Sequence, residues 1–153
     1  MRRLHTLLGI LVVLLSASTV LSQQETPAES PEKAVQKKPE KPEPIYDEKA
    51  DAPKQIAEAI KRAKKENQRV LIQWGANWCS WCHLLHDTFK EDKDVRRKLQ
   101  YEYDVVLIDI GQWNKNIDYA MTLGADLKAN GVPYLTVLNT DGKPIANQET
   151  GSL

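Results

Sequence analysis

Both cysteines of the chain, Cys79 and Cys82, lie in one ten-residue stretch, NWCSWCHLLH. The same stretch contains His83 and His86, two of the three histidines. The four side chains are spaced i, i+3, i+4 and i+7, and residues at this spacing share one face of a helix. They could serve as a redox dithiol, as a C-x-x-C-H haem attachment site or as zinc ligands. The choice among these three chemistries decides the function.

Zinc and haem fit the surroundings of the cluster less well than a dithiol does. Structural zinc sites usually join two separated ligand pairs, whereas these four residues lie on one expected helix and the chain has no other cysteine. The sequence C-S-W-C-H matches the haem attachment motif, but a haem domain also needs an apolar pocket and usually a second axial ligand. Met121 is available for that role, although packing in a helix explains it better. Haem attachment stays open as an alternative, and zinc as a weaker one.

The elements expected around the cluster alternate between helix and strand. Short β-branched or aromatic runs bounded by turn residues indicate strands, and apolar residues three or four positions apart indicate helices. We expect helices over residues 53–66, from the cysteine cluster to residue 89, and over residues 92–100 and 115–129, with Ile117, Met121 and Leu127 as core residues of the last. We expect strands over residues 69–76, 103–111, 134–139 and 144–149. This order predicts an α/β domain with parallel strands in its first part and a hairpin at its end.

The expected junction between strand 69–76 and the next helix supports the dithiol interpretation. A cysteine at a helix N-terminus faces unpaired N–H groups and the positive end of the helix dipole, which favour its thiolate. Cys79 has this position, and Cys82, one turn further and more buried, is within reach to resolve a mixed disulfide. Trp78 and Trp81 would shield the pair and offer a flat surface to substrates, or they pack against the domain.

A strand is followed by Trp78-Cys79-Ser80-Trp81-Cys82 and a helix, and Gly131-Val132-Pro133-Tyr134 then leads into a later strand. This order of elements and motifs resembles the thioredoxin superfamily. The resemblance covers about residues 53–151 and is in particular to exported thioredoxin-like domains with a W-C-x-x-C motif. It implies a thioredoxin-like fold with a central mixed sheet flanked by helices. It further implies that Pro133 is cis and lies against the dithiol, and that the backbone of Val132 pairs with the substrate.

Several positions depart from that family's pattern. Ser80 and Trp81 replace the usual Gly-Pro, and Gln73, which cannot ionise, stands where the family has a buried acid. His83 is a candidate for tuning the thiolate because it titrates near neutral pH, with a solvated helix residue as the alternative. His86 is expected to be a packed helix histidine. The family's last helix after the hairpin is missing here, so we expect either a truncated sequence or one open sheet face.

The N-terminal third has the composition of a leader and a linker. Arg2 and Arg3 precede an apolar run from Leu7 to Leu15, which is typical of a secretory signal peptide, residues 1–22; a retained membrane anchor is the alternative. Residues 23–45 hold five of the eight prolines and no aromatic residue, and this predicts a disordered linker before a domain at residues 46–153. We therefore expect an exported protein, periplasmic or extracellular, with a membrane tether only if the leader is retained.

These observations predict a protein thiol–disulfide oxidoreductase in which Cys79 attacks and Cys82 resolves. Its direction, as reductant, oxidant or isomerase, depends on its reduction potential. No cofactor besides the Cys79–Cys82 disulfide and no metal are expected. The partners would be protein thiols or disulfides and an unidentified redox partner; the balance of 21 basic and 21 acidic residues does not favour nucleic acid. A monomer is expected, and a thioredoxin-like module that binds proteins without catalysis is the main alternative.

Overall fold

The computed structural model describes residues 42–151 of the 153-residue chain. The expected signal peptide, residues 1–22, and nearly all of the expected linker lie outside the described residues. The chain divides into two units, residues 1–38 and residues 39–153, and every described residue belongs to the second. In this described part, no helix combines the length and hydropathy needed to cross a bilayer.

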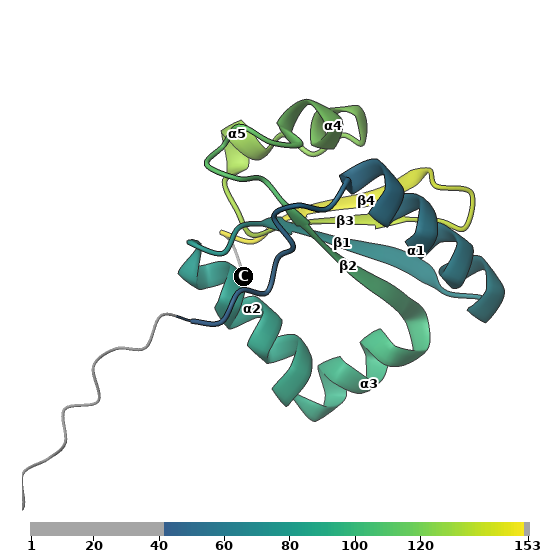
Figure 1. The fold of residues 1–153 in the computed structure, drawn as a ribbon. Coiled ribbons are helices and arrows are strands. Elements are labelled where there is room, and N and C mark those ends of the chain that lie inside the picture. The colour runs from purple at the N-terminus through teal and green to yellow at the C-terminus, as the bar shows by residue number, and fades with distance from the viewer. Residues whose placement is uncertain (1–41, 152–153) are drawn as a thin grey trace, which may run out of the picture. The chain divides into compact units, whose positions relative to one another are not determined.

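A four-stranded mixed sheet forms the centre of the domain (Figure 1). Its strands are arranged in the order β2-β1-β3-β4, with β1 parallel to β2 and antiparallel to β3, and with β3 and β4 as an antiparallel hairpin. The elements are α1 (Ala52–Glu66), β1 (Arg69–Gly75), α2 (Ser80–Glu91), α3 (Lys93–Glu102), β2 (Tyr103–Asp109), α4 (Ile117–Thr122), α5 (Leu127–Asn130), β3 (Tyr134–Leu138) and β4 (Pro144–Glu149). The predicted α/β class, with a parallel pair and a final hairpin, is confirmed.

Helix α1 packs on one face of the sheet, while α2 and α3 lie on the other (Figure 1). The Asp51 side chain caps the N-terminus of α1, and Asn67, in the left-handed region with φ 55°, ends this helix. The apolar stripe toward the sheet consists of Ala52, Ile56, Ala59 and Ala63. Burying one side chain the size of isoleucine contributes roughly 1.5–3 kcal/mol. On its exposed side, the Arg62 guanidinium makes two hydrogen bonds, of 2.7 and 2.9 Å, to the Asp104 carboxylate of β2.

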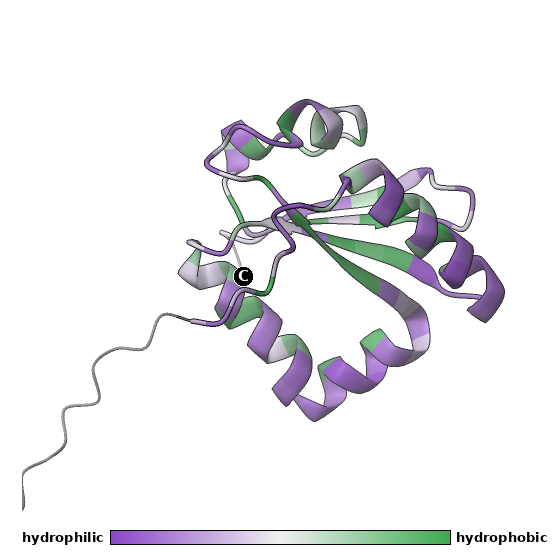
Figure 2. Cartoon of the chain, in the orientation of Figure 1, coloured by the Kyte–Doolittle hydropathy of each residue, from purple (hydrophilic) through white to green (hydrophobic). Residues whose placement is uncertain are grey.

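Strand β1 is the core of the sheet because it has a partner on each side and helices on both faces. Every residue from Val70 to Gly75 is buried. Figure 2 shows hydrophobic residues concentrated on β1 and β2 and hydrophilic residues along α1 and α3. The one polar ring atom of fully buried Trp74, Nε1–H, donates to Thr136 Oγ1 at 2.9 Å, so that burial leaves no donor of that side chain unpaired. This rigid strand ends directly before the cysteine motif.

The single helix expected over residues 115–129 is instead two short helices, α4 and α5, and this expectation was wrong. The chain turns at Gly124, which has φ 79°, and restarts at Asp126, whose carboxylate accepts the Ala129 N–H at 3.0 Å. A core position for Met121 was also wrong, because its side chain is 49% exposed. Its neighbour Ala120 is the buried residue, and adjacent residues of a helix point in different directions.

Candidate active site

Cys79 occupies the N-cap of α2, four residues after β1 ends at Gly75. Its backbone is extended, with φ −86° and ψ 103°, and the Cys82 N–H donates to Cys79 Sγ at 3.2 Å. The sulfur therefore receives one of the N–H groups that a helix N-terminus leaves unpaired. An N–H donor and the positive end of the helix dipole both favour a negative charge on this sulfur.

Cys79 and Cys82 form a disulfide with their Cα atoms 5.3 Å apart. Cys79 is 6% exposed, whereas Cys82 is fully buried. Of the two sulfurs, that of Cys79 is the one that a partner can approach. The difference in burial matches the division into an attacking and a resolving cysteine.

The Val132-Pro133 segment lies beside the exposed edge of the disulfide. The peptide bond between the two residues is cis, and the Val132 carbonyl oxygen is 3.8 Å from Cys79 Sγ. A surface pocket begins here and extends over α2; its apolar lining residues are Trp81, Leu84, Leu85, Val132 and Pro133. The apolar lining and the adjacent Val132 backbone suit an extended peptide segment.

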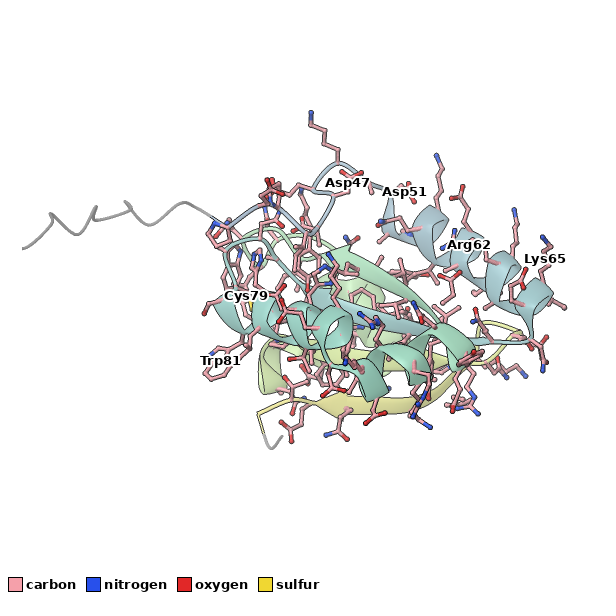
Figure 3. The ribbon with its side chains drawn as sticks, turned by 90° about the horizontal axis from the view of Figure 1, so that it is seen from below. Asp47, Asp51, Arg62, Lys65, Cys79 and Trp81 are labelled. Atoms are coloured by element: carbon pink, nitrogen blue, oxygen red, sulfur yellow. A yellow bond between two sulfur atoms is a disulfide. The ribbon has the colours of Figure 1, made fainter. Side chains whose placement is uncertain are left out.

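Two exposed tryptophans, Trp78 and Trp81, belong to the cysteine motif, and a third, Trp113, lies beside Trp78. Trp81 is 69% exposed, and Figure 3 shows it beside Cys79 at one end of the domain, with Lys65 of α1 at the opposite end. Trp78 donates its indole N–H to the Gly111 carbonyl oxygen at 2.7 Å, and its ring lies 6.1 Å from that of Trp113. Trp113 was not indicated by the sequence; it lies in the loop after β2 in the left-handed region, with φ 63°.

Gln73 is fully buried in the middle of β1, under the cysteine pair. Its side-chain N–H₂ donates to the Cys82 carbonyl oxygen at 3.0 Å and to the Tyr46 hydroxyl oxygen at 2.7 Å. Its Oε1 has no hydrogen-bond partner among the described residues. An unpaired buried oxygen costs about 1–3 kcal/mol. The two hydrogen bonds that the amide donates therefore fix its orientation even though this orientation leaves Oε1 without a donor.

Tyr46 is a site residue that the sequence did not indicate, because it stands at the edge of the expected linker. Its side chain is 3% exposed and packs with both cysteines. Asn77 holds the segment: its Oδ1 accepts the N–H groups of Ile45 and Tyr46, each at 2.9 Å, and its Nδ2 donates to the Tyr46 carbonyl oxygen at 3.0 Å. Burial raises the pKa of the Tyr46 phenol far above its usual range, and the Gln73 hydrogen bond only partly opposes this.

The sequence profile of the thioredoxin-like domain matches residues 56–153. The chain belongs to this thioredoxin-like family. A disulphide isomerase from Xylella fastidiosa Temecula1 is similar in structure, with 31% identity, a TM-score of 0.63, and coverage of 70% of this chain and 80% of that one.

The spermatogenesis-associated protein 20 of Mus musculus is 31% identical over 52 residues, and that of Homo sapiens is 29% identical over 52 residues. Each match covers 34% of this chain but spans only 7% of the relative's length.

In this thioredoxin-like domain the hydrogen bonds of the described residues join neither histidine of the motif to a disulfide sulfur. His83 Nε2 makes a 3.0 Å hydrogen bond with the Asn77 carbonyl oxygen, so this ring supports the loop before Cys79. His86 lies further along α2, and partial burial lowers its pKa from the ordinary histidine value, with the Lys90 charge acting in the same direction. No group of three or more His, Cys, Asp and Glu side chains in residues 42–151 is arranged to hold a metal ion.

The buried acid Asp109 lies near Gly75 and Tyr46, and the sequence did not indicate it as a site residue. Asp109, at the end of β2, is 4% exposed and pairs in register with Gly75. Its carboxylate accepts the Gly111 N–H at 3.0 Å and lies 3.6 Å from Lys115 Nζ. These contacts fix the loop that carries Trp113. The buried amide of Gln73 and the phenol of Tyr46, rather than an acid, form the polar layer that contacts Cys82.

Proposed function

We propose that this chain is an exported thiol–disulfide oxidoreductase that exchanges disulfides with protein substrates through Cys79 and Cys82. Membership of the thioredoxin-like family supports thiol–disulfide exchange in general. The observation that carries the proposal is the disulfide between Cys79, at the N-cap of α2 beside an apolar pocket, and fully buried Cys82. A structural staple that closes so short a loop would remove little entropy from the unfolded chain, so chemistry explains the pair better.

The exchange reaction conserves atoms and electrons. In the reducing direction, the Cys79 thiolate attacks one sulfur of a substrate disulfide, and the other substrate sulfur leaves as a thiolate. The Cys82 thiolate then attacks Cys79 Sγ, which releases the second substrate thiolate and forms the Cys79–Cys82 disulfide. Two electrons pass from the domain to the substrate, and the reverse sequence oxidises a substrate dithiol. The reduction potential measured against glutathione decides the direction.

The surface beside Cys79 is where we propose that substrates bind. The apolar pocket contains Trp81, Leu84 and Pro133, and it leads to the Val132 backbone. An extended, unfolded segment of a protein could lie in this pocket with its own backbone beside Val132 and its disulfide at Cys79. Trp78 and Trp113 extend the apolar surface on the side of the loop after β2.

Export through residues 1–22 is part of the same proposal, and it rests on the charge and hydropathy pattern of this segment alone. Fractionation of cells that express the full chain would test it. A processed form outside the cytoplasm is the expected result, and retention of the whole chain in the cytoplasm would contradict export. Recovery in the membrane fraction without processing would favour the anchor alternative.

Reduction of insulin disulfides by the purified chain with dithiothreitol tests the activity. We expect turnover by the parent chain and by Lys65→Ala, a surface control at the far end of the domain (Figure 3). Cys79→Ser should abolish turnover, whereas Cys82→Ser should accumulate a mixed disulfide between Cys79 and insulin. If the parent chain shows no turnover and Cys82→Ser traps no mixed disulfide, the result would favour a module that binds proteins without catalysis. The observation that favours this second candidate is Gln73, which cannot ionise and stands where the family has a buried acid.

A further inference from the structure

Opening of the disulfide leaves a negative charge on the most buried sulfur of the domain. When a thiolate attacks Cys79, the S–S bond breaks and Cys82 leaves with the electron pair, although its side chain is fully buried. A buried anion is unfavourable unless a hydrogen-bond donor or a proton stabilises it. Gln73 cannot transfer a proton, and its two N–H bonds go to the Cys82 carbonyl oxygen and to Tyr46.

The Tyr46 hydroxyl and the Cys82 sulfur border the same space beside Gly75. Both groups flank Gly75: a Cβ added to this glycine would lie 2.6 Å from Cys82 Sγ and would collide with the Tyr46 hydroxyl oxygen. No side chain separates the phenol from the sulfur at this point, because position 75 has none. The two residues also belong to one buried cluster.

The hydrogen bonds around the phenol leave its O–H free to donate. The hydroxyl oxygen accepts from Gln73 Nε2 at 2.7 Å, and a phenol that accepts through its oxygen keeps its own hydrogen for another acceptor. Asn77 fixes the Tyr46 backbone through three hydrogen bonds from its side chain to Ile45 and Tyr46. Burial keeps the phenol protonated at neutral pH, so it remains a donor.

We propose that the Tyr46 hydroxyl donates a hydrogen bond to the Cys82 sulfur when the disulfide opens, and thereby stabilises the Cys82 thiolate in the exchange reaction. The role of this hydrogen bond in catalysis rests on the proposed function. In the step itself the S–S bond breaks, Cys82 retains the electron pair, and the phenol keeps its proton throughout. The hydrogen bond takes over the stabilising role that an ionisable residue at position 73 would otherwise have.

A Tyr46→Phe substitution leaves the charged and titratable groups around the phenol unchanged. Asp109 of β2 acts on Tyr46 through its charge, and it lies near Lys115. Glu48, on the same segment as Tyr46, accepts from the Asn77 amide, and His83 of α2 bonds the Asn77 carbonyl oxygen. Replacement of the phenol by a benzyl group removes one O–H and none of these charges.

The experiment measures the pKa of Cys82 in the full chain with Cys79→Ser, by the ultraviolet absorbance of the thiolate against pH. Adding Tyr46→Phe should raise this pKa by roughly one to two units, the size of a hydrogen bond to a charged group. The control Tyr101→Phe, at a tyrosine that is 77% exposed, should leave it unchanged. The same pKa with and without Tyr46→Phe, in variants with unchanged circular dichroism, would overturn the proposal.

A second substitution keeps the test decisive if Tyr46→Phe does not fold. In the same Cys79→Ser chain, 3-fluorotyrosine placed at position 46 by amber suppression is a stronger O–H donor, so the Cys82 pKa should fall. An unchanged or higher pKa in this variant would contradict the proposal. Both titrations need no substrate, so an inactive parent chain in the insulin assay would refute the proposed function without deciding the role of Tyr46.

Discussion

Substitution of Gln73 by aspartate places an ionisable group beneath Cys82 and tests whether proton transfer limits resolution. The amide of Gln73 is 3.0 Å from the Cys82 carbonyl oxygen, so a carboxyl on the same strand position is near this cysteine. A carboxylate there can accept the proton that the Cys82 thiol must lose before it attacks the mixed disulfide. We expect release of a trapped Cys79–substrate disulfide near neutral pH to accelerate by about tenfold, below the 10²–10⁴ of a well-placed base, because aspartate is one methylene shorter.

The same substitution should destabilise the domain. The Cys82 carbonyl oxygen would lose its side-chain donor, at a cost of about 1–3 kcal/mol, and one buried methylene contributes about 0.8 kcal/mol. We expect a total loss of roughly 2–4 kcal/mol in the free energy of unfolding, measured by urea denaturation. Burial also raises the pKa of the introduced carboxyl, so the folded state binds a proton more tightly than the unfolded state. Stability should therefore fall as pH rises above about 4, the unfolded value.

Gln73→Asn is the matched control, since asparagine has the size of aspartate without an ionisable group. Stopped-flow measurement of substrate release from the preformed mixed disulfide would compare the three chains across pH 5 to 9. Faster release in Gln73→Asp alone, increasing with pH through the raised pKa, is the expected result. Equal rates in Gln73→Asp and Gln73→Asn would refute the reasoning that proton removal from Cys82 limits resolution.

Three further predictions concern the cysteines and the glycine between them and Tyr46. Reduced Cys79 should have a pKa below the roughly 8.5 of free cysteine because of its N-cap position, and Cys82 should not; iodoacetamide alkylation against pH checks this, and equal titration of both sulfurs would contradict it. The chain expressed with a cytochrome maturation system should be colourless, whereas a Soret band from covalently bound haem would replace the dithiol interpretation. Gly75→Ala should lower the free energy of unfolding by about 1–3 kcal/mol through overpacking against Cys82 Sγ; urea denaturation would show it, with Gly151→Ala as the comparison, because an added Cβ there meets only the end of the Glu149 side chain, at 3.2 Å. A loss at Gly75 no larger than at Gly151 would show that the space beside Cys82 is not closed.

The parts of the site that the sequence predicted are those encoded by short-range patterns. A buried apolar run that ends at Gly75, followed at once by the cysteine motif, indicates a strand, a turn and a helix start in that order. Cys79 lies at that helix start, and Gln73 lies on the strand below it. The order of strands and helices likewise predicts a parallel pair and a hairpin, and both are present.

The parts that the sequence did not predict depend on contacts between distant segments or on local backbone conformation. Tyr46 reaches Gln73 across 27 residues, and nothing in the residues around it marks this contact. Trp113 lies beside Trp78 with a positive φ, which is uncommon for a bulky residue and is not indicated by its neighbours in the sequence. Met121 has the helical spacing of a core residue, but in α4 the buried position belongs to Ala120, and Met121 is exposed. The positions of these side chains follow from tertiary structure that no short stretch of sequence specifies.

The amide of Gln73 and the phenol of Tyr46 act on Cys82 together. Because Gln73 donates to the Tyr46 oxygen, the phenol hydrogen is available for the Cys82 sulfur. A carboxylate at position 73 would instead accept that hydrogen and turn the phenol away from the sulfur. The two substitutions should therefore not be additive: Tyr46→Phe should raise the Cys82 pKa in the Gln73 chain, but by much less in Gln73→Asp, when both are measured with Cys79→Ser. An equal rise in both chains would show that the phenol acts on Cys82 independently of the residue at position 73.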